Sequence, residues 1–242
     1  MIVETPVDGA ALAARAADLV TESAEDAIAA RGRFTLALSG GDTPAAFLGE
    51  LASRPLPWEA IHLFQVDERV APPGHPDRNL TGLLSTLVER VPLPAANLHA
   101  MPVDDPDLSA AAERHAAELA RVTGTGALDV VHLGLGDDGH TASWPSGDPV
   151  VDATADVAVI GPYRGRLRMT LTPRAVNRAG RILWLVSGRD KAGVVARLVA
   201  GDPALPASRV RRDRATLLAG DGAGALLQGR WRPAGGGQPV PW

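Results

Sequence analysis

The segment Val130-Val-His-Leu-Gly-Leu-Gly-Asp-Asp-Gly-His140 begins as an apolar run and ends in glycines, acids and an imidazole. A short apolar run of this kind is typical of a strand buried on both faces of a parallel sheet. We predict that strand over residues 128–135. Ligands of open parallel sheets bind outside the carboxyl ends of the strands, where the following loops meet. We therefore expect Asp138 and His140 to lie at a ligand-binding edge.

The rest of the chain alternates between strand and helix patterns. Further strands are predicted at residues 34–39, 61–66, 155–160, 167–172, 181–187 and 215–219, and helices at 10–31, 44–53, 79–90, 108–122 and 189–200. Strands separated by helices indicate βαβ units. The expected fold class is therefore α/β, with a mostly parallel sheet and helices on both faces. No linker or repeat divides the chain, so we expect a single domain over 1–242, in which 228–242 is an irregular tail rich in glycine and proline.

Composition limits where and with what the protein acts. The 242 residues are 45% hydrophobic, include no cysteine and carry a net charge of −4, which argues against disulfides, thiolate metal sites and a nucleic-acid partner. The chain has no apolar run of about 18 residues that could span a bilayer and no signal-peptide pattern at its start. These features predict a cytoplasmic protein with no membrane partner. They leave the oligomeric state open, and a monomer is compatible with them.

The turn Ser39-Gly40-Gly41 follows the predicted strand at 34–39. Two glycines allow the backbone N–H groups to approach a ligand closely, and the N-terminus of the following helix favours negative charge. We predict that this turn binds substrate and that the Gly40 and Gly41 amides stabilise a developing oxyanion. A tight turn without any ligand is the alternative.

Charged residues follow or open other predicted strands. Asp67 and Arg69 come directly after residues 61–66, and Arg168 stands near the start of the strand at 167–172. Lys191 lies in the first turn of a predicted helix, where a cation is unfavourable unless an anion occupies the site. These residues are predicted to bind the substrate.

His140 is the candidate base. Asp138 lies two residues before it, and the glycine between them lets the carboxylate fold back onto the imidazole and fix its tautomer. A metal site needs three or four converging ligands, and this loop has no cysteine and no second histidine. We therefore predict no metal. The pattern Gly134-Leu-Gly-Asp-Asp-Gly139 also matches a dinucleotide fingerprint, but it lacks the acidic ribose partner that such a site requires.

The order and spacing of these blocks resemble the 6-phosphogluconolactonase family over residues 30–220. The resemblance rests on Gly134-x-Gly-x-Asp138-Gly-His140-Thr-Ala-Ser143, Ser39-Gly-Gly-x-Thr-Pro44, Asp67-Glu-Arg69, Arg168-x-Thr-Leu-Thr172 and Gly188-x-x-Lys191. It implies a Rossmann-like sheet that binds no nicotinamide, and a hydrolase acting on a phosphorylated sugar lactone without a cofactor. It also implies His140 as general base, Asp138 as its orienter, and Arg69, Arg168 and Lys191 as cations for the phosphate and polar groups of the substrate.

Two alternatives remain at this point. The same scaffold serves glucosamine-6-phosphate deaminases, whose corresponding loop carries a glutamate five residues after the histidine; here that residue is Pro145. A non-catalytic sugar-phosphate sensor is the second alternative. One departure from the family pattern, Trp144-Pro-Ser146 in place of Leu-Phe-Pro, puts the shape of this loop in question.

Overall fold

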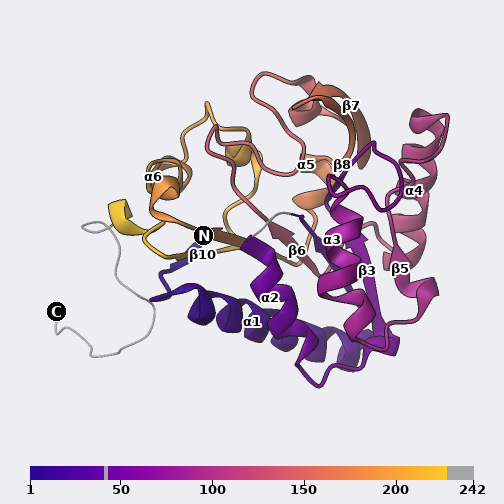
Figure 1. Cartoon of the computed structure of the whole chain (residues 1–242), viewed down its shortest axis with the longest axis horizontal. Helices are drawn as coiled ribbons and strands as arrows, with labels where there is room; N and C mark the ends of the chain where they lie inside the picture. The colour runs from indigo at the N-terminus through magenta and orange to yellow at the C-terminus, as the bar shows by residue number, and fades with distance from the viewer. Residues whose placement is uncertain (41–42, 228–242) are drawn as a thin grey trace.

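The computed structural model describes residues 1–40 and 43–227 and centres on a parallel sheet of seven strands (Figure 1). The strand order is β1-β10-β9-β6-β2-β3-β5, and every neighbouring pair is parallel. The strands are β1 (Ile2–Glu4), β2 (Phe34–Leu38), β3 (Ile61–Gln65), β5 (Leu98–His99), β6 (Val130–Leu133), β9 (Arg181–Ser187) and β10 (Ala215–Gly220). The predicted α/β class and parallel sheet are confirmed.

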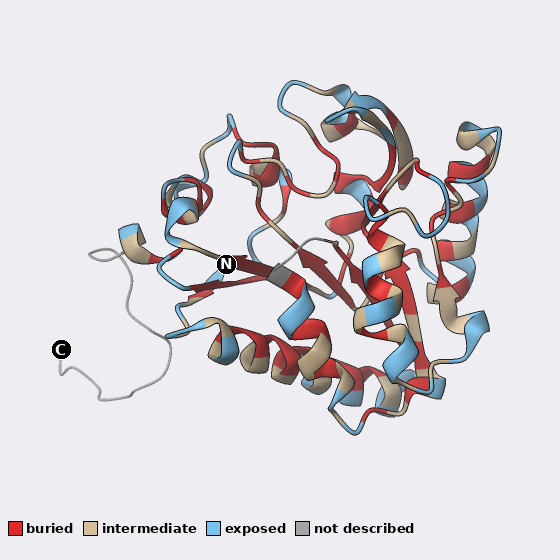
Figure 2. Cartoon of the chain, viewed as in Figure 1, coloured by how far each residue is buried: buried red, intermediate tan, exposed pale blue. Residues whose placement is uncertain are grey.

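Helices cover both faces of this sheet, so β2, β6 and β10 are buried at every position and their side chains enter two separate cores (Figure 2). In β2, Leu36 and Leu38 join the core formed with α1, α2 and α3, whereas Ala37 joins the opposite core, which includes residues of α4, α5 and α6. The helices are α1 (Gly9–Arg31), α2 (Thr43–Ala52), α3 (Asn79–Thr86), α4 (Leu108–Thr123), α5 (Pro173–Val176) and α6 (Ala192–Ala200).

The ends of the long helices follow from local sequence. Asp8 caps α1 by accepting a hydrogen bond from the Ala11 amide at 2.8 Å, and Gly32 ends the helix with φ +73°. Asp107 and Gly124 do the same for α4. An acidic N-cap and a left-handed glycine after the last turn satisfy the backbone groups that a helix leaves free.

A second, smaller sheet was not predicted. Strands β4 (Asp67–Arg69), β8 (Arg166–Leu171) and β7 (Val157–Tyr163) form it in the order β4-β8-β7, with antiparallel pairing throughout. The predicted strands at 155–160 and 167–172 therefore exist but lie outside the parallel sheet. A two-residue turn, Arg164-Gly165, joins them, and both residues have positive φ, as tight hairpin turns require.

Smaller differences concern element ends. The helix predicted from 189 starts at Ala192, because Arg189–Lys191 forms a 3-10 turn, and the short edge strands β1 and β5 carry too few residues to show a pattern. Gly41 and the tail 228–242 lie outside the described residues. Within residues 1–40 and 43–227, no helix has both the length and the apolar character needed to cross a membrane.

Candidate active site

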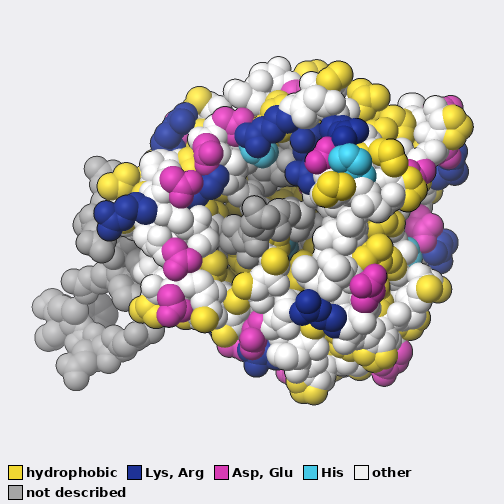
Figure 3. Space-filling view, in the orientation of Figure 1, with side chains coloured by type: hydrophobic (Ala, Val, Ile, Leu, Met, Phe, Trp, Pro, Cys, Tyr) yellow, Lys and Arg dark blue, Asp and Glu magenta, His cyan; other side chains and the backbone are white. Residues whose placement is uncertain are grey.

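A cavity of about 350 Å³ opens at the carboxyl edge of the parallel sheet. The loops after β2, β3, β6 and β9 contribute to its walls, and the β7–β8 hairpin adds Arg164 and Arg168. A neighbouring cavity of about 440 Å³ shares part of this wall, including Ser39, Gly40 and Arg69. In the space-filling view, basic side chains gather along the upper rim of the hollow on this face (Figure 3).

Asp138 and His140 form a hydrogen-bonded pair in the loop after β6. The Asp138 Oδ1 atom lies 2.5 Å from His140 Nδ1 and also accepts the His140 backbone amide at 3.2 Å. With Nδ1–H donated to the carboxylate, the lone pair of the neutral imidazole resides on Nε2. Burial alone would raise the pKa of Asp138, but the hydrogen bonds from His140 and Tyr163 outweigh it and lower the pKa to about 2. These hydrogen bonds therefore fix the orientation of the imidazole.

Two glycines make this loop possible. A Cβ at Gly136 would lie 2.0 Å from His140 Nδ1, so the imidazole can fold back only over a residue without a side chain. Gly139 has φ +81°, and a Cβ there would lie 2.5 Å from the side chain of Leu205. The loop that carries His140 therefore depends on both glycines.

Tyr163, which the sequence analysis missed, lies against this pair. Its hydroxyl donates to Asp138 Oδ2 at 3.0 Å and is 3.1 Å from His140 Nδ1. The ring meets the His140 ring edge to face, with centroids 5.4 Å apart. No local pattern around residue 163 indicates this contact, because it joins segments 23 residues apart in the chain.

Three arginines of β4 and the β7–β8 hairpin concentrate positive charge on the cavity wall. Arg69 of β4 and Arg168 of β8 are direct partners across an antiparallel pair, an unfavourable position for like charges unless an anion lies nearby. Arg164 also lines the cavity, and no salt bridge of its guanidinium is found among the described residues. Burial lowers the pKa of Arg168, the Asp67 carboxylate opposes this shift, and the charges of Arg69 and Arg164 add to it. This wall favours a bound anion.

Asp67 lies behind the arginines rather than in open solvent. Its carboxylate accepts from Ser143 Oγ at 2.6 Å and from Asn79 Nδ2 at 3.2 Å, and it is 3.8 Å from Arg168 Nη1. The side chain is only 7% exposed. Asp67 thus lines the cavity and also fixes the surrounding polar groups.

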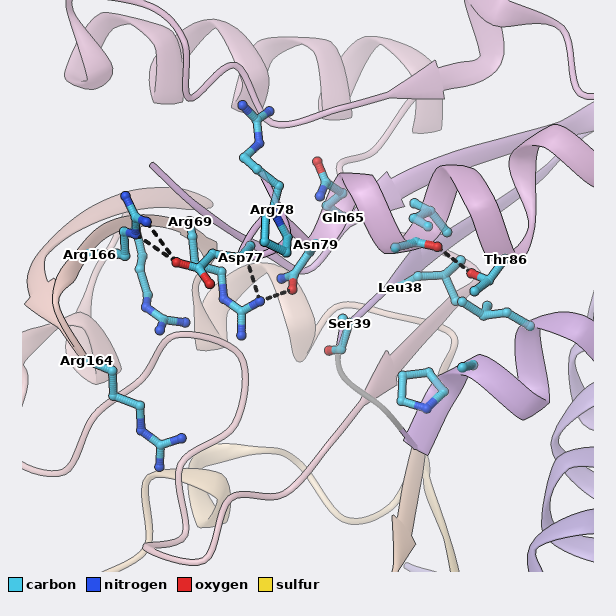
Figure 4. Close-up of a pocket in the computed structure, with 18 residues that line it drawn as sticks. Leu38, Ser39, Gln65, Arg69, Asp77, Arg78, Asn79, Thr86, Arg164 and Arg166 are labelled. Atoms are coloured by element: carbon cyan, nitrogen blue, oxygen red, sulfur yellow. Dashed lines mark hydrogen bonds and ion pairs between the residues drawn. The ribbon is translucent and has the colours of Figure 1, made fainter. Parts of the chain in front are cut away.

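Asn79 and Glu68, which were also missed, hold the arginine wall in place. Asn79 Oδ1 accepts from Arg69 Nη1 at 2.5 Å (Figure 4). The fully buried Glu68 accepts from the backbone amides of Arg69, Asn79 and Leu80 at 2.7–2.8 Å. A Cβ at Gly40 would lie 1.9 Å from Asn79 Oδ1, so glycine at position 40 allows this close approach.

Ser39 lines the cavity while its hydroxyl is bonded elsewhere. Its Oγ donates to the His132 carbonyl at 3.0 Å, and its amide donates to His132 Nδ1 at 3.3 Å. Burial lowers the pKa of His132 to about 4, and its Nε2 has no partner among the described residues. The imidazole of His132 is therefore a neutral support beneath the Ser39 turn.

Lys191 reaches the cavity from the 3-10 turn after β9. Its Nζ contacts the Asp137 carboxylate, which is 73% exposed. Asp137 therefore supplies the negative charge that the helix dipole argument assigned to a bound anion. The role of Lys191 toward substrate stays a prediction.

The unusual loop at 144–146 is anchored by its tryptophan. Trp144 is fully buried, and its Nε1 donates to the Leu171 carbonyl of β8 at 2.8 Å. The departure from the family pattern thus ties the loop after His140 to the small sheet.

The structure brings most of the predicted site residues to one cavity. Its wall includes Ser39, Gly40, Asp67, Arg69, His140, Arg168 and Lys191, while Asp138 is bonded to His140 behind it. Gly41 lies outside the described residues, so its predicted contact is open. Across the described ranges, no cluster of three or more histidine, aspartate or glutamate side chains is arranged to hold a metal ion.

Comparison with known proteins agrees with the geometry. Residues 7–219 match the family described as Glucosamine-6-phosphate isomerases/6-phosphogluconolactonase. The chain belongs to this family.

Named relatives of the family are similar over most of their length. The chain is 36% identical over 203 residues to a 6-phosphogluconolactonase of Nostoc sp., covering 82% of this chain and 85% of that protein. It is 38% identical over 194 residues to a 6-phosphogluconolactonase of Synechocystis sp., covering 78% and 81%. The crystal structure of 6-phosphogluconolactonase from Thermotoga maritima matches with a TM-score of 0.82 at 26% identity, over 91% of this chain and 99% of that one. The family resemblance found in the motifs is confirmed.

Proposed function

We propose that this protein hydrolyses 6-phospho-D-glucono-1,5-lactone to 6-phospho-D-gluconate. The observation that carries the proposal is that the Asp138–His140 pair opens on the same cavity as Arg69, Arg164 and Arg168. Hydrolysis of a phosphorylated lactone needs a base for water at one end and cations for the phosphate at the other. Relatives named 6-phosphogluconolactonase, at 36–38% identity, support the same activity.

His140 is the proposed general base. Its Nε2 takes a proton from water as the water oxygen bonds to the lactone carbonyl carbon, a role that contributes roughly 10²–10⁴ in rate. Asp138 stabilises the imidazolium that forms. When the tetrahedral intermediate collapses, the bond from this carbon to the ring oxygen breaks, and Nε2 returns its proton to that oxygen. No covalent intermediate with the protein is needed.

The cavity wall supplies the remaining interactions. Arg69, Arg168 and Lys191 are proposed to hold the phosphate and polar groups, and charge-assisted bonds of this kind contribute about 1.5–3 kcal/mol each. Gly40 and Gly41 amides are proposed for the oxyanion, although Gly41 lies beyond the described residues. A volume of about 350 Å³ is in the range of pockets for small ligands.

The reaction as proposed needs no metal and no cofactor, and its partner is the small phosphorylated lactone rather than a nucleic acid or a membrane. We place it in the cytoplasm. Activity that survives a strong chelator would support the metal-free mechanism, and activity lost to the chelator and rescued by a divalent ion would contradict it.

The proposed function is tested by measuring lactone hydrolysis in a coupled assay against the spontaneous rate. We expect efficient hydrolysis of the phosphorylated lactone and poor hydrolysis of gluconolactone, which lacks the phosphate. Equal efficiency on the two lactones would remove the reason for a phosphate site at Arg69, Arg168 and Lys191.

The deaminase alternative makes a different demand on the loop after His140. Pro145 stands where the deaminases carry a glutamate, and it has no proton to give. The nearest acids are engaged: Asp148 accepts the Val150 amide at 2.8 Å, and Asp152 pairs with Arg209 at 3.2 Å. We expect no ammonia from glucosamine 6-phosphate at matched enzyme concentration. Ammonia released at a rate comparable with lactone hydrolysis would overturn the lactonase assignment.

A further inference from the structure

We infer that Tyr163 is a positioning residue for the Asp138–His140 pair, and that its hydroxyl controls how strongly Asp138 supports a proton on His140. The inference rests on the proposed function and assigns the β7–β8 hairpin a part in the chemistry as well as in anion binding. Within the described part of the chain, Tyr163 lines neither cavity. It therefore acts through Asp138 and not on the substrate.

The hydrogen bonds leave one consistent arrangement of protons. Asp138 Oδ1 accepts from His140 Nδ1 and from the His140 amide, so Oδ2 is left for another donor. The Tyr163 hydroxyl has a single proton, and a carboxylate at 3.0 Å is a better acceptor for it than an Nδ1 atom that already carries a proton. The tyrosine thus holds Oδ2, while the two bonds from His140 hold Oδ1.

This donor also withdraws negative charge from the carboxylate. A carboxylate that accepts a further hydrogen bond stabilises a neighbouring imidazolium less, because part of its charge is already compensated. Tyr163 contributes in this way to lowering the pKa of Asp138, while burial and the bond to Asp138 raise the pKa of Tyr163 itself. Removing the hydroxyl should therefore let Asp138 favour the protonated imidazole more strongly.

Two arginines of the hairpin contact the tyrosine ring. The Arg168 guanidinium lies 5.0 Å from the ring centroid, and Arg168 Nε donates to the Tyr163 carbonyl at 3.2 Å. Arg164 lies 5.4 Å from the same centroid. A cation over a tyrosine face is an attractive contact. Arg168, which is proposed to bind the anion, and Tyr163 are thus in direct contact.

Other charged groups surround His140 and must be kept constant in a test. Asp138 and Tyr163 are bonded to it or next to it, and the cavity wall around it also carries Asp67, Arg69, Arg164, Arg168 and Lys191, the last paired with Asp137. None of these is altered by Tyr163→Phe, which keeps the ring and removes only the hydroxyl.

The kinetic test compares wild type with Tyr163→Phe. We expect kcat to fall on the order of tenfold, the effect of losing one hydrogen bond to a charged group, with KM nearly unchanged. We also expect the acidic limb of the pH–rate profile to move toward higher pH. A role in packing alone would lower the rate at every pH and leave the limb in place. Leu167→Thr, at a 40%-exposed position of the same hairpin, is the matched control and should leave both quantities unchanged.

A second readout does not depend on activity. Tyr163 is the only tyrosine in the chain, so the ultraviolet absorbance of tyrosinate during an alkaline titration reports this hydroxyl alone. We expect the titration midpoint to lie above that of free tyrosine and to fall in Asp138→Asn, where the carboxylate is absent. An unmoved midpoint in Asp138→Asn would overturn the hydrogen bond whatever the activity.

The two readouts separate the two proposals. A wild type that does not hydrolyse the lactone overturns the proposed function, and the positioning role for that reaction with it, even if the titration behaves as expected. A wild type that does hydrolyse it, with Tyr163→Phe unchanged in kcat and pH profile, overturns the positioning role alone.

Discussion

The loop after β6 and the β7–β8 hairpin face the same cavity, but they are built in different ways. The β6 loop is short and tightly closed: the Gly136 amide bonds to the His140 carbonyl at 2.8 Å, and the Ala207 amide bonds to the Gly139 carbonyl at 3.1 Å. The hairpin is a strand pair with two positive-φ residues at its tip, and it carries three arginines within residues 164–168. The loop carries the proposed base, His140, and the hairpin carries arginines and the tyrosine that contacts Asp138.

This difference implies that the loop and the hairpin have separate roles, in the chemical step and in substrate binding, which mutations can distinguish. Changes in the β6 loop should mainly lower kcat, because they alter the reacting groups. Changes in the hairpin cations should mainly raise KM, because they weaken binding of the anion. Tyr163 is the exception, since it belongs to the hairpin and acts on the loop.

The largest effect is expected at His140. His140→Asn should leave the fold intact and remove about two to four decades of kcat, because asparagine cannot take a proton from water. The wild-type rate should fall at acid pH, where a protonated imidazole has no lone pair to act as base. The measurement is lactone hydrolysis across the range in which imidazoles titrate, with circular dichroism as the folding control. Near wild-type activity in a folded His140→Asn would contradict the assignment.

The other histidine of this segment predicts a pH effect on stability. Burial lowers the pKa of His132 to about 4, below the ordinary value of 6.5, so the unfolded chain binds a proton that the folded chain does not. The free energy of unfolding therefore has its full value, with respect to this group, above about pH 6.5, and it decreases as the pH falls toward about 4. One such histidine lowers the free energy of unfolding by roughly 3 kcal/mol across that pH range.

Urea unfolding at several pH values between about 7 and 4 tests whether His132 causes this pH dependence of stability. His132→Asn keeps an acceptor for the Ser39 amide and removes the titration, so the slope of unfolding free energy against pH should become shallower. The remaining slope should come from the other histidines whose pKa burial lowers, which are His115, to about 4, and also His62 and His99. An unchanged slope would mean that His132 is not the group responsible.

The sequence predicts the parallel sheet and the β6 loop well, because their signals are local. Apolar runs that end in glycine indicate buried strands, and the Asp138-Gly139-His140 spacing shows the acid and the imidazole within a few residues. Two strands of the small sheet are also predicted, at 155–160 and 167–172, but no local signal shows that they pair with each other and with β4 outside the parallel sheet. Strand β4 is only Asp67–Arg69, a charged triplet that is extended because Glu68 and Asp67 find partners from distant segments.

The hairpin is hard to predict for a related reason. Its turn uses Arg164-Gly165 and not the usual Asn-Gly or Asp-Gly, and an irregular register between Ile160 and Tyr163 interrupts the alternation of the strand. The Tyr163 and Asn79 contacts arise only when separate loops come together in the folded chain. The only signal in the sequence that could have indicated a role for Tyr163 is that the single tyrosine of the chain precedes an arginine-rich turn.

A moderate effect is expected at Arg168. Arg168→Met should raise KM for the phosphorylated lactone roughly 10- to 100-fold, the loss of a charge-assisted contact, with a smaller change in kcat. Arg168→Lys should recover only part of the binding, because lysine keeps the charge but cannot reproduce the planar contact over Tyr163 at 5.0 Å. If KM rises equally for gluconolactone, which has no phosphate, Arg168 does not bind the phosphate.

The smallest effect is expected at Lys191. Its size tests whether the 3-10 turn after β9 belongs to the substrate-binding site, in addition to the β6 loop and the hairpin. Lys191 contacts Asp137 of the β6 loop, but Asp137 is 73% exposed, and ion pairs of that kind contribute about 0–1 kcal/mol. A phosphate with nearly two negative charges can displace such a weak partner. Lys191→Met should therefore raise KM about three- to fivefold, within the energy of one exposed pair.

Asp137→Asn is the matched variant, because it frees Lys191 without removing it. Substrate binding in Asp137→Asn should be as tight as in wild type or tighter, since the phosphate no longer competes with a carboxylate for the ammonium group. If Lys191→Met leaves KM unchanged while Asp137→Asn weakens binding, the pair only shapes the β6 loop. The anion would then be held by the arginines of β4 and the hairpin without help from the turn after β9.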